Sequence, residues 1–263
     1  MSLLRRIANR AAQTIRDFRN REVEVISHMD ADGVAAAAVI SLALDREGIE
    51  HRVKFVRMLY REVVEDLEPA ELTIFTDLGS SQLENLSRKY SGHHVIIADH
   101  HLPDAGFEWP ELVHFNAHRM GIDGMQDISG AGMAYFIARE LSGKNKDLAS
   151  IALVGALGDV QNAWGSLTGL NTEIASDAIE MGLVKKEHDL LLYGRHSRPL
   201  FKALENFNDP PIPGVSGSPA GCVSMLKQLD IPLKSGDRWR RLVDLSLAEK
   251  QKLASELIAR IFL

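Results

Sequence analysis

Four apolar runs of this 263-residue chain are followed directly by aspartates, and one of these aspartates stands beside two histidines. Three of the runs are predicted strands and the fourth is a predicted helix. In open α/β sheets, functional groups collect where strands end at their carboxyl edge, so these side chains are expected to point into one rim. The residues are Asp30 and Asp32, Asp77, Asp99 with His100 and His101, and Asp159.

Several carboxylates in one cleft repel each other, and a pair of divalent cations is the simplest way to neutralise them. Carboxylates mixed with imidazoles suit Mn²⁺ or Mg²⁺ better than they suit a thiol-rich Zn²⁺ site. Two ions that share a carboxylate lie about 3.5–4 Å apart and activate a water for in-line attack on a phosphate. The alternative interpretation is structural: Asp30 and Asp32 form a turn and a helix N-cap, and Asp77 is a second N-cap.

The spacing of apolar residues predicts the elements that carry these groups. The predicted strands are 22–27, 52–56, 72–76, 94–98 and 112–115, and the predicted helices lie within residues 1–20 and at 34–44, 80–90, 130–141, 148–158, 172–181 and 246–263. Strands that alternate with helices indicate an α/β fold with a mostly parallel sheet covered by helices. We therefore expect a domain at residues 1–190, followed by a mainly helical extension at 191–263.

The composition limits the classes of partner. The chain carries 30 Lys and Arg against 36 Asp and Glu, so phosphate binding needs a local basic patch or metal ions to overcome this balance. The single cysteine, Cys222, excludes an internal disulfide and fits a reducing cytosol, so a cytoplasmic protein is expected. No apolar run approaches the ~18–20 residues of a membrane span, and no membrane partner is expected.

Four motifs resemble those of the DHH phosphoesterase superfamily. They are His-Met-Asp-Ala-Asp-Gly at 28–33, Phe-Thr-Asp-Leu-Gly at 75–79, Ala-Asp-His-His at 98–101 and Gly-Ala-Leu-Gly-Asp at 155–159. Asn-Ala-His at 116–118 and the segment 127–135 are similar to the RecJ-like branch, in particular to archaeal single-strand exonuclease homologues. The later segments 194–203 and 239–242 resemble the same branch.

The resemblance implies a binuclear Mn²⁺ site, in which Mg²⁺ is also possible. It implies that Asp77 bridges the two ions, that His101 contacts the scissile phosphate, and that Asp99 orients the histidine pair. His28 is either a ligand or a residue that supports one. The remaining implied ligands are Asp30, Asp32, Asp159 and His100.

Candidate substrate contacts form three groups. The helix start at Ser129, Gly130 and Gly132 is a possible phosphate seat, because its N–H groups are free, or else an ordinary capped helix. Asn116 and His118 are assigned to substrate binding through the motif that contains them. Arg195 and Arg198 form a basic cluster that can hold a nucleic-acid backbone. Trp239, which lies among arginines, can stack on a strand, although packing in a helix is the favoured interpretation.

The function implied first is a Mn²⁺-dependent phosphodiesterase resembling RecJ-like exonucleases of single-stranded DNA or RNA. One alternative is a phosphodiesterase for short oligonucleotides or cyclic dinucleotides. The other is a replication scaffold that associates with GINS and has weak or no nuclease activity. The histidine-containing glycine-rich motif of the DHHA1 substrate domain does not follow residue 160, so we expect this chain alone to bind metal with inefficient turnover.

Overall fold

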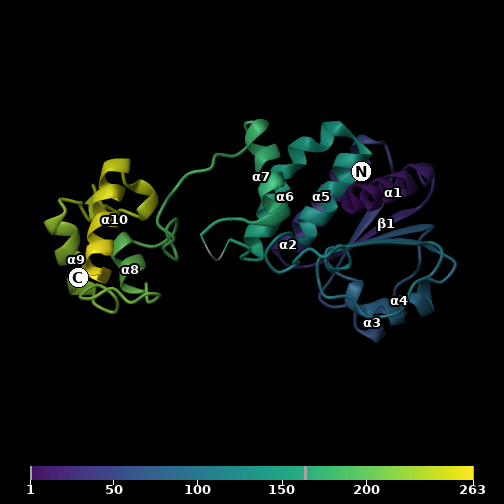
Figure 1. Cartoon of the computed structure of the whole chain (residues 1–263), viewed down its shortest axis with the longest axis horizontal. Coiled ribbons are helices and arrows are strands. Elements are labelled where there is room, and N and C mark those ends of the chain that lie inside the picture. The colour runs from purple at the N-terminus through teal and green to yellow at the C-terminus, as the bar shows by residue number, and fades with distance from the viewer. Residues whose placement is uncertain (1, 163–164, 263) are drawn as a thin grey trace. The chain divides into compact units, whose positions relative to one another are not determined.

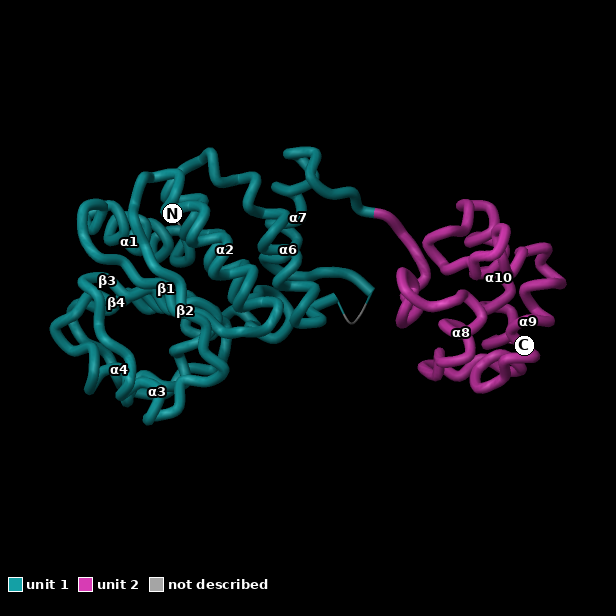
Figure 2. Tube along the Cα trace, turned by 180° about the vertical axis from the view of Figure 1, so that it is seen from behind, with its two compact units in different colours: residues 1–186 teal, residues 187–263 magenta. Residues whose placement is uncertain are grey.

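The computed structural model describes residues 2–162 and 165–262 and forms two compact units, residues 1–186 and 187–263 (Figure 1, Figure 2). The first unit contains a five-stranded sheet in the order β2-β1-β3-β4-β5, and every neighbouring pair is parallel. The strands are β1 (Val23–His28), β2 (His51–Val56), β3 (Leu72–Thr76), β4 (His94–Asp99) and β5 (Leu112–Asn116). The predicted α/β fold with a parallel sheet is confirmed.

Both faces of this sheet are covered, because the buried side chains of each strand alternate between two cores. Val25, Ile74 and Ile96 lie in register across three strands and belong to the larger core. The next residue of each strand, as in Phe75, belongs to the smaller core on the other face. Helices α1 (Leu3–Asp17), α2 (Ala31–Arg46), α5 (Gly130–Leu141), α6 (Ala149–Gly158) and α7 (Gly169–Glu180) contribute to the larger core, and α3 (Arg61–Glu65) and α4 (Leu83–Tyr90) to the smaller one.

The second unit has a core of its own, which includes Leu204, Leu226, Leu242 and Leu253. It contains α8 (Leu200–Glu205), α9 (Pro219–Gln228), the two-residue strands β6 (Lys234–Ser235) and β7 (Arg238–Trp239), and α10 (Leu247–Phe262). Four 3₁₀ helices complete the assignment of the described residues: η1 (Ser80–Gln82), η2 (His118–Met120), η3 (Gly143–Leu148) and η4 (Leu242–Asp244). Among the described residues, no helix combines the length and the apolar character needed to cross a membrane.

The sequence-based elements agree with this structure where the apolar pattern is long. Strand 72–76 and helix 130–141 have the expected bounds, with Ser129 as the N-cap of α5. The predicted helix at 80–90 begins with a 3₁₀ turn, and the predicted helix at 246–263 is α10, whose last predicted residue lies outside the described residues. The short elements α3, α8, α9, β6 and β7 were not predicted.

The first helix is tied to the end of α5 by a single arginine. Arg16 Nη2 donates to the carbonyls of Glu140 and Leu141, at 2.8 and 2.7 Å. These are carbonyls of the last turn of α5, which have no partner within their own helix. The amphipathic N-terminal helix therefore contributes to the stability of α5 through a cation as well as through its apolar face.

We expect Arg16→Met to lower the free energy of unfolding by about 1–3 kcal/mol, because two charge-assisted hydrogen bonds are lost while the aliphatic stem is kept. Arg10→Met, on the exposed face of the same helix, is the matched control and is expected to change stability little. Urea unfolding followed by circular dichroism measures both. Equal midpoints for the two variants would contradict this role of Arg16.

Candidate metal centre

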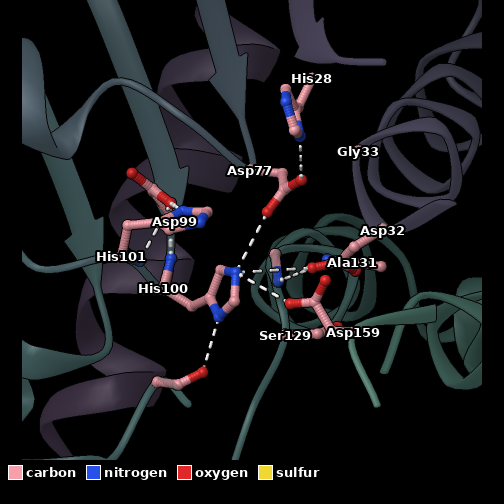
Figure 3. Close-up of polar contacts among 12 residues, drawn as sticks. His28, Asp32, Gly33, Asp77, Asp99, His100, His101, Ser129, Ala131 and Asp159 are labelled. Carbon is pink, nitrogen blue, oxygen red and sulfur yellow. Dashed lines mark hydrogen bonds and ion pairs between the residues drawn. The ribbon is translucent and has the colours of Figure 1, made fainter. Parts of the chain in front are cut away.

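The candidate site lies at the carboxyl ends of β1, β3 and β4. β1 and β3 are neighbours in the sheet. The next strand in sequence after β1, which is β2, lies on the outer side of β1, whereas β4 lies on the opposite side, next to β3. The direction in which strands are added to the sheet therefore reverses between β1 and β3. Ligands of open α/β sheets bind at such a reversal. Figure 3 shows side chains from these three strand ends and from the end of α6 converging there, and they include His28, Asp77, His100 and Asp159.

Asp77 lies at the centre of this group. Its backbone is left-handed, with φ at 60°, and its N–H donates to the carbonyl of Ala98 at 2.9 Å. The residue is 2% exposed, and neither carboxylate oxygen has a hydrogen-bond partner among the described residues. The nearest cationic groups are His100 Nε2 at 3.2 Å from Oδ1 and His28 Nδ1 at 3.7 Å from Oδ2. A buried carboxylate without hydrogen bonds is costly unless a cation compensates it.

Potential ligand atoms gather around Asp77 in overlapping clusters. His28, Asp30 and Asp77 place one ligand atom each within 4.8 Å of one another, and so do Asp32, His100 and Asp159. Asp77 and His100 also form such a cluster with His101. Asp77 therefore belongs to two of these clusters, and the bridging role that the family resemblance implies for it stays a prediction.

The ring of His100 is oriented so that Nε2 can bind a metal ion. Its Nδ1 lies 2.6 Å from the carbonyl of Gly124, and a carbonyl only accepts, so Nδ1 carries the proton. Nε2 is buried without a hydrogen-bond partner among the described residues and faces carboxylates of Asp77 and Asp159 at 3.2 and 3.3 Å. This is the arrangement of a histidine whose tautomer is fixed by a backbone acceptor. The donor set, with its orphaned oxygens and nitrogen, fits divalent cations.

The N-terminus of α5 binds a carboxylate of the protein itself. Asp32 is fully buried, and its oxygens accept from the N–H groups of Gly130 and Ala131 at 2.6 and 2.9 Å. The N–H of Gly132 donates to Ser129 Oγ at 3.2 Å. The N–H groups of Gly130 and Gly132, which belong to the predicted phosphate seat, are therefore already used. These bonds favour the alternative interpretation of Ser129, Gly130 and Gly132 as a capped helix start, and their role as substrate contacts stays a prediction.

Glycines create the space that these carboxylates occupy. A Cβ at Gly130 would lie 2.4 Å from Asp77 Oδ1, and a Cβ at Gly155 would lie 2.2 Å from Asp32 Oδ1. Both distances are far below van der Waals contact. Helices α5 and α6 therefore approach the ligands more closely than any other residue type would allow.

Asp99 has a supporting role in the structure. It is fully buried and accepts from the N–H groups of Ser80, His100 and His101 and from His101 Nδ1, at 2.8–3.1 Å. Its hydrogen-bonding capacity is used, whereas the half-exposed His101 keeps Nε2 free to face a ligand. The geometry fits the sequence-based proposal that Asp99 orients the histidines.

The other predicted substrate contacts lie in different environments. Asn116 is fully buried and donates to Ser80 Oγ and to the His101 carbonyl at 2.9 and 2.8 Å, so its side chain supports the His101 turn, and its role in substrate binding stays a prediction. His118 is partly exposed, and its Nε2 lies 2.9 Å from where a Cβ of Gly124 would be, beside the support of His100. Arg195 and Arg198 belong to the second unit and contact residues of that unit.

Gln161 was missed at the sequence level. This 5% exposed residue donates through Nε2 to the carbonyls of Gly124 and Ile128, at 2.9 and 3.0 Å, and its Oε1 accepts from Asn171 at 2.6 Å. Gln161 thus holds the carbonyl of Gly124, which binds His100. It also holds the carbonyl of Ile128, which lies just before the N–H groups that bind Asp32. The only signal in the sequence is its place two residues after Asp159, because the carbonyls it meets are set by tertiary packing.

The clustered charges shift the protonation of the site. The proximity of Asp77, followed by the charge of Asp30, raises the pKa of His28 to about 9, although burial opposes it. Burial likewise opposes the charge of His100, but Asp77 and Asp32 raise its pKa to about 10. Burial and the charge of Asp77 raise the pKa of Asp32 to about 8. Burial also raises the pKa of Asp159, whereas the two histidines lower that of Asp77 despite its burial.

Comparison with known proteins places this geometry in a family. The profile of the DHH family, N-terminal domain, matches residues 22–156, and that of the DHH-CID domain matches residues 192–262. The chain belongs to the DHH family. The predicted membership is confirmed, and the candidate centre lies largely within the segment matched by the DHH N-terminal domain.

One relative by sequence and two solved structures illustrate the similarity, all at low sequence identity. Protein MJ0831 of Methanocaldococcus jannaschii, named as uncharacterised, is 31% identical over an alignment of 243 residues, and the match covers 90% of this chain and 53% of the relative. RecJ of Thermus thermophilus, solved with Mn²⁺, has a TM-score of 0.54 at 21% identity and covers 96% of this chain. CDC45 of Entamoeba histolytica has a TM-score of 0.63 at 15% identity, also over 96%. The chain spans 53%, 37% and 56% of these three proteins, respectively.

A methyl group at position 155 tests whether the close approach of α6 is needed for metal binding. Because it would lie 2.2 Å from Asp32 Oδ1 and 2.5 Å from Ala131 Cβ, Gly155→Ala is expected to displace Asp32 and to weaken Mn²⁺ binding by about 10–100-fold. Gly143→Ala is the matched control, since no atom lies within 4 Å of its Cβ position. Titration calorimetry measures both affinities, and an unchanged affinity for Gly155→Ala would exclude this requirement.

Metal binding is also expected to release protons. Ligand imidazoles bind metal in their deprotonated form, and the raised pKa values of His28 and His100 keep protons on both rings at neutral pH. The affinity for Mn²⁺ should therefore rise between pH 6 and 8, by about tenfold per pH unit for each proton released. Calorimetry in buffers of different ionisation enthalpy counts the protons released. A heat of Mn²⁺ binding that is the same in every buffer would contradict the raised pKa values.

Proposed function

We propose that the chain is a phosphodiesterase that depends on Mn²⁺ or Mg²⁺ and cleaves single-stranded nucleic acid. The observation that carries the proposal is the buried carboxylate of Asp77, whose two unpartnered oxygens lie between two groups of potential ligands. Membership of the DHH family and the fold shared with a RecJ structure solved with Mn²⁺ support it.

In this proposal the metal ligands are Asp30, Asp32, Asp77, Asp159 and His100, together with His28. Two divalent cations held there would supply an activated water and neutralise charge on the phosphate. The bond to Asp99 raises the pKa of His101 although burial opposes it, and this favours the charged ring, whose Nε2–H can donate to a phosphate oxygen. Asp99 holds the ring in that orientation through Nδ1.

The predicted alternatives differ in what they require of this site. Hydrolysis of short oligonucleotides or cyclic dinucleotides uses the same ligands and differs only in substrate length. A GINS-associated scaffold needs no complete ligand set, so the convergence of all six candidate ligands favours an enzyme. The fold shared with CDC45 is compatible with either role.

The test is cleavage of end-labelled 20-nucleotide DNA and RNA strands and of dinucleotides by the full chain, with Mn²⁺, Mg²⁺ or EDTA. Asp77→Asn is expected to lower the rate by at least about 100-fold, because the shared ligand is lost, and His101→Ala to lower kcat by about 100-fold. Asp66→Asn and His93→Ala, both exposed, are the matched controls.

The pattern of rates separates the candidate functions. Faster cleavage of dinucleotides than of long strands would favour the short-substrate alternative. If the unaltered chain binds Mn²⁺ by calorimetry but cleaves no phosphodiester, the proposed activity is wrong and the metal centre remains.

A further inference from the structure

Two segments of the second unit that are about 40 residues apart in sequence lie side by side. The N–H of Leu200 donates to the carbonyl of Arg240 at 2.8 Å, and Arg241 Nη1 donates to the carbonyl of His196 at 2.8 Å. The loop before α8 is thereby held against strand β7 and the residues that follow it. We call this combination of residues 193–201 and 234–241 the loop–hairpin surface.

Aromatic rings are exposed on this surface. Trp239 lies in β7 and is 41% exposed, which corrects the expectation that it packs within a helix. Its ring centroid lies 5.2 Å from that of Phe201, and Lys234 Nζ lies 4.5 Å from it. Tyr193 is 77% exposed, and the guanidinium of Arg198 lies 4.8 Å from its centroid. Each exposed ring is thus paired with a cation, which is a combination suited to a base and its phosphate.

The cations of the surface fall into two classes. Arg238 and Arg241 pair with Asp244, and Arg240 pairs with Glu249, so their charges are compensated within the unit. Arg195, Arg198 and Lys234, in contrast, make no salt bridge with any described residue. These three groups keep their charge available for an anionic ligand.

The local charge also differs from that of the chain as a whole. Residues 187–263 carry 11 Lys and Arg against nine Asp and Glu, whereas residues 1–186 carry 19 against 27. The second unit is therefore the part of the chain that does not repel a polyanion. A long-range field of this sign favours the approach of nucleic acid.

We propose that the loop–hairpin surface is a binding site for single-stranded nucleic acid that is separate from the metal centre. Bases stack on Tyr193 and Trp239, and phosphates pair with Arg195, Arg198 and Lys234. Single strands are preferred because a duplex buries the faces of its bases in its own stack. The site requires no metal, so it does not depend on the proposed catalytic activity.

The test measures binding of the full chain to fluorescent 20-nucleotide strands by anisotropy, in EDTA and at several NaCl concentrations. Tyr193→Ala and Trp239→Leu are each expected to weaken binding at least about fivefold through loss of a stacking ring. Replacing Arg198 or Lys234 by Gln is expected to reduce the slope of log affinity against log salt by about 0.7 per lost phosphate contact. Phe262→Ala and Lys227→Gln, exposed in the same unit, are the matched controls.

Comparison ligands separate stacking from charge alone. An abasic strand of the same length and a duplex are both expected to bind more weakly than the single strand. Equal binding of the abasic strand, unchanged affinity of both ring variants, or no binding of the unaltered chain would each overturn the proposal. Because Tyr193 is so exposed, its replacement tests the proposal even if Trp239→Leu fails to fold. If the chain binds single strands in EDTA but cleaves none of them when Mn²⁺ or Mg²⁺ is added, the proposed activity is wrong and the proposed binding surface stands.

Discussion

The candidate site of the first unit depends on the burial of one negative charge, the carboxylate of Asp77. A desolvated carboxylate without hydrogen bonds is unfavourable, and its surroundings compensate for it electrostatically. His28 and His100 face it from two strand ends and gain affinity for protons as a result. Gly130 leaves the space in which it lies. The same unfavourable charge is what makes the position suited to a cation.

The acidic residues of the centre divide by how their oxygens are used. Asp99 accepts hydrogen bonds from backbone and imidazole donors, and Asp32 accepts from the N-terminus of α5, whereas neither oxygen of Asp77 has a hydrogen-bond partner among the described residues. The favourable end of a helix dipole thus stabilises a carboxylate of the protein where the sequence suggested a substrate phosphate. These aspartates all follow apolar runs in the sequence, but they differ in their hydrogen-bond partners, because different backbone N–H groups lie within reach of each one.

The sequence predicted the parallel sheet and the residues that converge on its edge, because both follow from local patterns. Apolar runs mark β3 and β4. Because the two strands are parallel, the residues that follow both runs lie at the same carboxyl edge of the sheet. The parts that were not predicted depend on contacts distant in sequence. Gln161 acts on the carbonyls of Gly124 and Ile128, and the N–H of Leu200 meets the carbonyl of Arg240. Asn116 has a polar side chain, and only its burial shows that it serves the turn of His101.

The carbonyl oxygen of Gly124 accepts hydrogen bonds from both His100 and Gln161, so a substitution at this one position affects both side chains. A Cβ at this position would lie 1.9 Å from the carbonyl oxygen of His100, so no other residue is a conservative replacement. A duplicated copy could therefore lose its centre through one codon change at 124 while every aspartate and histidine stayed in place. In this chain the aspartates and histidines are therefore not sufficient for the candidate centre, because Gly124 is required as well.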